Sequence, residues 1–282
     1  LGKGLPFPAD CALPTMLVAW LSVTELSTWP TSILQLAKVV PEFPTQPEQA
    51  MITIRKASDR GRTRLSWLDS RHTFSFGNYR DPAHDGVSSL RVINDDRVAP
   101  GGGFATHGHD NMEIVTCVLS GSLEHKDSMG NGSVIRSGDV QCMSAGTGVT
   151  HSEFNHSQEE AVHFLQIWLI PNRRDVAPAY SQQHFSAEER RGRWRLLVSP
   201  DGRDGSIATH QDALLYGTVL DREETLEHAP GPGRLSWLHV ARGATKVNGK
   251  VLEAGDGALL ERDIPAIVTG MDRAEMLLFD LP

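Results

Sequence analysis

Four metal-binding side chains occur in two short, similar pairs. His107 and His109 stand two residues apart in "GFATHGHDNMEIV", and His151 and Glu153 stand two apart in "GVTHSEFN". Side chains at positions i and i+2 of a strand point to the same face. Two such pairs on neighbouring strands can direct three imidazoles and one carboxylate at a single point. This donor set suits one divalent transition metal, such as Fe, Cu, Ni, Mn or Zn.

Either pair alone has a simpler interpretation, because a buried histidine is more often a hydrogen-bonded core residue than a ligand. Two pairs with equal spacing on either side of one predicted hairpin favour a metal site. Other histidines lack a paired spacing. We expect His156 and His163 to be structural, His125 to be a solvated strand residue or a partner of the ligands, and His72 to be a residue of the surrounding segment.

The elements that must position these residues are short strands. From residue 51 onward, runs such as "EIVTCVLSG" and "HFLQIWLIP" are separated by Gly, Asn and Asp, a pattern typical of an all-β sandwich or barrel. Only "FSAEERRGRWRLL" resembles a helix, where Ser186 and Glu189 form a capping-box pattern. This short connecting helix separates two β-rich halves.

The two halves share a repeated segment. "NGSVIRSGDV" begins at Asn131 and "NGKVLEAGDG" begins at Asn248, which is an offset of 248 − 131 = 117 residues. Asn-Gly favours a tight hairpin turn, and Gly-Asp predicts a second turn one strand later. The repeat indicates a duplicated barrel. The same offset carries His151 to Val268 and Glu153 to Gly270, so we expect a metal in the first barrel only.

Composition narrows the class of protein. The chain has 282 residues, 39% hydrophobic and 22% charged, with a formal net charge of -8. Its length suggests two domains, and an acidic chain without a basic stripe is a poor candidate for direct nucleic-acid binding. Cys11, Cys117 and Cys142 form no closely spaced pair, which fits a reducing, cytoplasmic setting.

The first fifty residues differ in composition from the rest. They contain seven of the sixteen prolines, and their longest apolar run, "MLVAWL", is far below the roughly 20 residues that span a bilayer. We therefore expect residues 1–50 to form a poorly structured extension upstream of Met51, with no membrane segment. The predicted domains are an N-terminal metal-binding barrel over residues 51–182 and a C-terminal barrel without metal over residues 183–282.

Longer motifs resemble those of a known family. "HGHDNMEIVTCVLSG" and "GDVQCMSAGTGVTHSEFN" resemble the two cupin motifs, and "WLDSRHTFSFGNY", "LEHKDSMGN" and "QIWLIP" are similar to segments of the pirin family. The resemblance runs from about Met51 to Pro282 and implies two cupin-type β-barrels, a bicupin of double-stranded β-helices. Pirins usually have Pro between the first two histidines, where this chain has Gly108, which loosens the backbone there.

The resemblance also bears on the carboxylate ligand. General cupins take it from the first motif, which would be Glu113, whereas pirins take it from the second, which is Glu153. It therefore implies that His107, His109, His151 and Glu153 bind the metal, with iron favoured. Glu113 becomes a structural or supporting group.

The activity implied by this resemblance is that of a quercetin 2,3-dioxygenase. A flavonol would bind the metal through its 3-hydroxyl, Glu153 would act as general base, and O2 would cleave the heterocycle to a depside and carbon monoxide. From position alone we expect Phe104, Met112 and Phe154 to line the pocket. Two alternatives remain: a metal-containing regulator that binds a protein partner, and a small-molecule sensor with incidental turnover. We expect a monomer.

Overall fold

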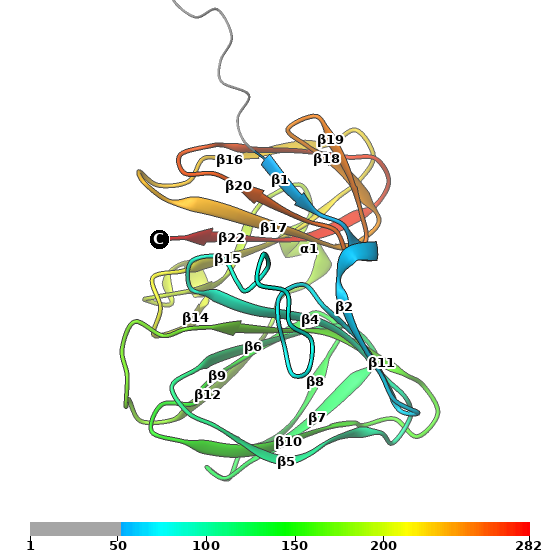
Figure 1. The fold of residues 1–282 in the computed structure, drawn as a ribbon, viewed down its shortest axis with the longest axis vertical. Coiled ribbons are helices and arrows are strands. Elements are labelled where there is room, and N and C mark those ends of the chain that lie inside the picture. The colour runs from blue at the N-terminus through cyan, green and yellow to red at the C-terminus, as the bar shows by residue number, and fades with distance from the viewer. Residues whose placement is uncertain (1–51) are drawn as a thin grey trace, which may run out of the picture. The chain divides into compact units, whose positions relative to one another are not determined.

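The computed structural model describes residues 52–282, and nearly all of its regular structure is β-strand (Figure 1). The strands form two seven-stranded and two four-stranded sheets, one of each size in each half of the chain. This confirms the predicted all-β, two-barrel fold. The extension expected over residues 1–50 lies outside the described residues. Within residues 52–282 no helix is long and apolar enough to cross a membrane.

The first half builds one large and one small sheet. The large sheet has the order β12-β9-β6-β11-β4-β3-β2 and the small sheet the order β5-β10-β7-β8. Their bounds are β2 Gly61–Arg64, β3 Leu68–His72, β4 Leu90–Val98, β5 Gly103–His109, β6 Glu113–Ser120, β7 Ser122–Asp127, β8 Gly132–Arg136, β9 Asp139–Ser144, β10 Val149–Asn155, β11 Val162–Leu169 and β12 Ala179–His184.

The second half repeats this plan. Its large sheet has the order β1-β20-β17-β22-β15-β13-β14 and its small sheet the order β16-β21-β18-β19. The bounds are β1 Ile52–Arg55, β13 Arg195–Ser199, β14 Ile207–Ala208, β15 Leu214–Leu220, β16 Thr225–His228, β17 Leu235–Arg242, β18 Ala244–Val247, β19 Lys250–Glu253, β20 Gly257–Leu260, β21 Ala266–Gly270 and β22 Ala274–Leu281. Adding eleven to the labels β4 to β11 reproduces β15 to β22 in the same pairing, as a duplication requires.

Turn chemistry explains part of this repeat. Asn248 and Gly249 both have positive φ, 45° and 80°, and form the hairpin turn between β18 and β19, as Asn-Gly predicts. The first copy differs, because the chain turns over residues 128–130 and Asn131-Gly132 leads into β8. The prediction of a tight Asn-Gly turn is wrong there. The glycines of both Gly-Asp pairs, Gly138 and Gly255, have positive φ and turn the chain as expected.

The short helix between the halves is α1, Ala187–Arg190. One 3-10 turn, η2 (Ala57–Asp59), precedes it in the chain, and another, η3 (Arg203–Gly205), follows it. Ser186 accepts a hydrogen bond from the backbone N–H of Glu189, whose side chain returns one to Ser186. The predicted capping box is present. The proposed division between residues 182 and 183 falls inside β12 and remains a prediction.

The first strand joins the second half. β1 pairs with β20 along its whole length, and Figure 1 shows it among the C-terminal strands. It occupies the edge position that β12 occupies beside β9 in the first half. The chain then returns through η2, where the Arg60 guanidinium donates to Asp95 of β4 at 3.2 Å. Sequence periodicity carries no information about the pairing of β1 with the second half, because this pairing depends on which sheet has a free edge.

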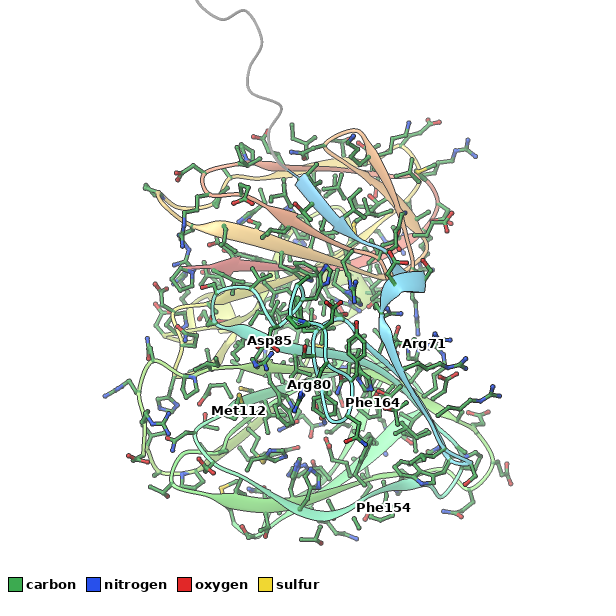
Figure 2. All side chains as sticks on the ribbon, viewed as in Figure 1. Arg71, Arg80, Asp85, Met112, Phe154 and Phe164 are labelled. Carbon is green, nitrogen blue, oxygen red and sulfur yellow. The ribbon has the colours of Figure 1, made fainter. Side chains whose placement is uncertain are left out.

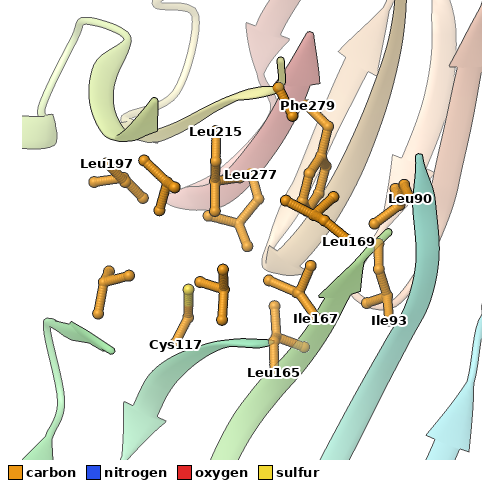
Figure 3. Packing of buried hydrophobic residues seen from close by; sticks show 14 of the residues in the cluster. Leu90, Ile93, Cys117, Leu165, Ile167, Leu169, Leu197, Leu215, Leu277 and Phe279 are labelled. Atoms are coloured by element: carbon orange, nitrogen blue, oxygen red, sulfur yellow. The ribbon is translucent and has the colours of Figure 1, made fainter. Parts of the chain in front are cut away.

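The largest apolar core lies between the two seven-stranded sheets. Figure 3 shows Cys117, Leu165 and Ile167 of the first half facing Leu215 and Leu277 of the second. Alternate residues of β11 serve this core, while Phe164, Gln166 and Trp168 point to the opposite face of the strand, as period-2 alternation requires. One face of each large sheet is therefore committed to packing, and the other face encloses a barrel interior.

The two barrel interiors differ in polarity. The second contains one continuous apolar cluster that includes Leu238, Val247 and Val268. The first contains two separate small clusters, one around Phe164 and one around Met143. The first half also contains polar side chains that are fully or almost fully buried, among them His125, His151, Glu153, Asn94 and Asp96.

A buried histidine in the second half provides a test of the fold's pH dependence. His239 of β17 is fully buried, and neither ring nitrogen has a hydrogen-bond partner among the described residues. Burial, with a smaller contribution from Arg60, lowers the pKa of His239 to about 3. An unfolded histidine titrates near 6.5. Between these values the unfolded chain binds a proton that the folded protein does not.

We therefore predict that the free energy of unfolding of His239→Leu rises relative to the native protein as the pH falls from 6.5 toward 4. The difference grows by up to about 1.4 kcal/mol per pH unit. Guanidinium unfolding at several pH values measures it, with His156→Leu at a more exposed histidine as control. A difference that stays constant with pH would show that His239 is protonated in the folded state.

Candidate metal centre

Two antiparallel strands bring three imidazoles together. His107 and His109 lie on β5, and His151 lies directly opposite His107 on β10. Directly opposed side chains on one face of such a pair have Cβ atoms about 4.5–5.5 Å apart. The ring centroids of the three histidines are 4.5 to 4.9 Å from one another. The shared-face expectation for both pairs therefore agrees with the register.

The ring nitrogens converge more closely than the rings. Nε2 of His107 and Nε2 of His151 are 3.1 Å apart, and one nitrogen of each of the three imidazoles lies within 4.8 Å of the others. Donors bonded to a tetrahedral cation at about 2.0–2.1 Å stand roughly 3.3 Å apart. The cluster thus has the spacing of a coordination sphere without large rearrangement.

A hydrogen bond to the backbone fixes the orientation of the His107 ring. Its Nδ1 donates to the carbonyl of Ala105 at 2.9 Å, which leaves Nε2 with a free lone pair. A backbone carbonyl behind a metal-binding histidine commonly sets the tautomer in this way. In the metal-free chain, His107 and His151 can share only one hydrogen between their Nε2 atoms, and a cation would take its place. The position between the two β5 histidines, Gly108, has room for a side chain, with Thr150 at 3.7 Å.

Glu153 lies deeper in the barrel than the imidazoles. A β-bulge in the β5–β10 pairing shifts the register, so that Glu153 faces Phe104. Its Oε2 accepts from Gln166 at 2.7 Å, while Oε1 is buried without a hydrogen-bond partner among the described residues. Glu153 forms a group with His151 and His125, whose donor atoms also lie within 4.8 Å of one another. His151 belongs to both groups.

Burial favours the neutral forms of His109, His151 and Glu153. It lowers the pKa of His109 to about 4 and that of His151 to about 3, with His107 adding to both effects. Burial likewise raises the pKa of Glu153 to about 7, against the hydrogen bond from Gln166. Neutral imidazoles are the form that binds metals. A buried carboxylate is costly without a positive partner, so the unpaired Oε1 fits a site that a divalent cation completes.

The cluster opens on an aromatic cavity of about 610 Å³. Trp67 and Phe104 meet edge to face at 5.1 Å on one side, and Phe76 and Trp168 meet similarly at 5.3 Å on another. The His109 ring packs against Trp168 at 4.9 Å. A cavity of this size accommodates a small organic molecule, and its walls suit planar rings.

Of the three residues expected to line the pocket, the structure confirms one and corrects two. Phe104 lines the cavity as expected, but Met112 packs with Met143 in a separate cluster, and Phe154, labelled in Figure 2, is 39% exposed. Phe154 neighbours Glu153 in sequence, and alternation therefore directs it to the opposite face of β10.

Glu113 is buried away from the imidazole cluster. Its Oε2 accepts from the hydroxyls of Ser144 and Thr209, both at 2.7 Å, and from the backbone N–H of His210 at 3.2 Å. Because Thr209 and His210 follow β14, this carboxylate ties the second half to β6. Its expected structural role agrees with these contacts.

The other histidines considered from the sequence lie in different environments. His72 lines the cavity and hydrogen-bonds Asn94 at 2.8 Å, and His125 is fully buried beside His151. A solvated His125 is therefore wrong. His156 is exposed next to Glu124, and His163 donates to Asp95 at 2.7 Å.

Sequence reasoning missed several polar residues at the cavity. Asp96 and Trp168 each carry a buried polar atom, Oδ1 and Nε1, without a partner among the described residues. Gln166 holds Glu153. Asp96 stands on β4, and Gln166 and Trp168 stand on β11, where they alternate with residues of the core between the sheets. For Gln166 and Trp168 this alternation was the available sequence signal, whereas Asp96 stands between Asp95 and Arg97 and shows no such pattern.

Two duplicated cupin-type barrels, with a histidine cluster in the first, define the chain as a bicupin. The family model for pirin matches residues 53–169, and that for the quercetinase C-terminal cupin domain matches residues 196–281. The chain belongs to the pirin family.

Individual relatives support this assignment. The chain is 45% identical over 232 residues to quercetin 2,3-dioxygenase of Escherichia coli K12, covering 82% of this chain and 99% of the relative. It is 37% identical to a pirin-like protein of Caulobacter vibrioides over 80% of this chain and 98% of the relative. The crystal structure of the bacterial pirin YhhW from E. coli in complex with nickel(II) superposes with a TM-score of 0.79 at 44% identity, over 82% of this chain and 99% of that one.

Replacing each candidate carboxylate separately tests the ligand set. We predict that Glu153→Gln weakens Ni(II) binding at least tenfold, because it removes the buried charge that faces the imidazoles. Glu113→Gln should leave Ni(II) affinity unchanged and lower the free energy of unfolding by about 1–3 kcal/mol, since a neutral amide oxygen replaces the buried carboxylate oxygen that accepts all three hydrogen bonds. Calorimetric titration and elemental analysis measure the metal. Loss of metal in Glu113→Gln alone would reverse the assignment.

Proposed function

We propose that this chain is a metal-dependent dioxygenase that opens the heterocycle of flavonols such as quercetin with O2. The observation that carries the proposal is the convergence of three imidazoles beside an aromatic cavity. The identity to a quercetin 2,3-dioxygenase over nearly that protein's whole length supports it.

The proposed ligands are His107, His109, His151 and Glu153. A bound divalent transition metal supplies a Lewis-acidic position for a substrate oxygen and a redox partner for O2. Iron is the metal that we propose, because imidazole and carboxylate suit it and because the chemistry consumes O2. Because the E. coli pirin forms a complex with nickel(II), Ni(II) is a suitable probe for this site.

Residues of this chain bind the substrate, exclude water and accept its proton. The facing pairs Trp67–Phe104 and Phe76–Trp168 bind the planar rings and exclude water. Glu153 accepts the proton of the flavonol 3-hydroxyl as general base, while Gln166 holds its Oε2 by a hydrogen bond.

The proposal includes a cellular compartment and an oligomeric state. Cys117 and Cys142 are free and buried, which supports a reducing, cytoplasmic compartment. The apolar faces of the two large sheets cover each other, which supports a monomer. The substrates in this proposal are a flavonol and O2.

Aerobic incubation with quercetin tests the proposed activity. We predict that native protein bleaches the visible absorbance of quercetin, with one O2 consumed and one carbon monoxide released per molecule. Chelator treatment should abolish turnover, and added Fe(II) or Ni(II) should restore it. His107→Ala should lower turnover by at least a hundredfold, since it removes a ligand, while His156→Ala on the surface should leave it unchanged.

Two outcomes would contradict the proposal. Turnover that is indifferent to His107→Ala would reject metal chemistry at this site. Absence of turnover with every first-row divalent metal, in protein that binds one metal per chain, would reject the activity while leaving the site intact.

A further inference from the structure

A buried histidine outside the proposed ligand set lies against it. His125 of β7 is directly opposite Glu153 of β10 and faces the barrel interior. Its side chain and that of Asp127 are both fully buried. The His125 ring neighbours two others, with its centroid 5.3 Å from that of His151 and 4.9 Å from that of Tyr180.

Asp127 determines which nitrogen of His125 carries hydrogen. Its Oδ2 is 3.1 Å from His125 Nε2 and 2.9 Å from the side-chain amide of Asn131. Its Oδ1 accepts from the backbone N–H groups of Met129 and Asn131 at 2.9 and 3.0 Å. A carboxylate that receives these hydrogen bonds is an acceptor, so His125 Nε2 must donate to it. Nδ1 of a neutral His125 is then a bare lone pair.

Two more unpaired atoms belong to side chains of the same buried group. Nδ1 of His125, Nδ1 of His151 and Oε1 of Glu153 are all buried without hydrogen-bond partners among the described residues. One ligand atom from each of these three side chains lies within 4.8 Å of the others, and polar groups at such a separation can be joined by one bridging water. Buried polar atoms left unpaired are costly, so the group requires an arrangement in which they satisfy each other.

We propose that His125 is a positioning residue for the metal centre: its Nδ1 accepts the Nδ1–H of His151, directly or through one water, so that His151 presents Nε2 to the metal. This inference rests on the metal site proposed above. When Nε2 of His151 binds a cation, its hydrogen must reside on Nδ1. Among the unpaired atoms nearby, Glu153 Oε1 is committed to the cation, and His125 Nδ1 is the remaining acceptor. Such partners orient ligand rings and raise their basicity.

The tautomer of His125 is the first measurement. Long-range 1H–15N correlation spectra of the metal-free and Zn(II)-loaded protein should show His125 with hydrogen on Nε2 and none on Nδ1 in both forms. In the Zn(II)-loaded form, His151 should carry its hydrogen on Nδ1. A hydrogen on Nδ1 of His125 would place two donors face to face and would overturn the proposal.

Two amide variants separate the roles of the two nitrogens. His125→Asn places an amide oxygen close to the position of Nδ1, whereas His125→Gln reaches toward Asp127 and offers no acceptor at that position. We expect Ni(II) affinity to fall 10- to 100-fold in His125→Gln, the range typical of lost partners of metal ligands, and less than threefold in His125→Asn. His156→Gln, at an exposed histidine, is the control and should match the native protein.

Thermal unfolding of the metal-free variants separates metal binding from folding. Equal losses of Ni(II) affinity in His125→Asn and His125→Gln would indicate a packing role and contradict the proposal, as would native affinity in both. Neither the tautomer measurement nor the Ni(II) titration uses quercetin, so both can be interpreted even if the protein has no dioxygenase activity. Failure of the native protein to bind Ni(II) would instead refute the metal site itself.

Discussion

The constraint on which this structure depends is the burial of metal-binding polar groups inside a β-barrel. His151 and Glu153 are 2% and 1% exposed, and an interior of this kind tolerates polar atoms only when they are paired. The fold supplies partners from the backbone and from neighbouring strands: the Ala105 carbonyl behind His107, and Gln166 beside Glu153. The donor atoms left over include the Nε2 atoms of His107 and His151, 3.1 Å apart, and the unpaired Oε1 of Glu153, which the proposed cation would satisfy.

The duplicated second half shows what the same frame becomes without that requirement. On its small sheet, Leu226 faces Val268, and Val247 flanks them, at the positions that correspond to His107, His151 and Asp127. These residues complete one continuous apolar cluster, whereas the first barrel has its apolar residues divided into two smaller ones. The second half therefore serves as a scaffold. It also supplies the opposing face of the large core and receives strand β1.

Local spacing made the ligand pairs and the two-barrel fold predictable. Positions i and i+2 share a face wherever a strand forms, and glycines of positive φ mark its turns. Contacts set by distant pairing were not predictable. The bulge that lowers Glu153 into the barrel, the exchange of β1 into the second half and the burial of His125 all depend on which strands are neighbours. Phe154 follows Glu153 directly in the sequence, and alternation along β10 therefore places the two side chains on opposite faces of the strand.

The most direct test of the account is the coordination sphere itself. X-ray absorption spectroscopy of protein loaded with one Ni(II) per chain counts imidazole ligands by their outer-shell scattering. We expect three imidazoles and at least one oxygen, with one imidazole lost in His107→Ala, in His109→Ala and in His151→Ala. A sphere composed of oxygen with one imidazole or none, unchanged by these substitutions, would contradict the claim that the two strands build a single metal centre.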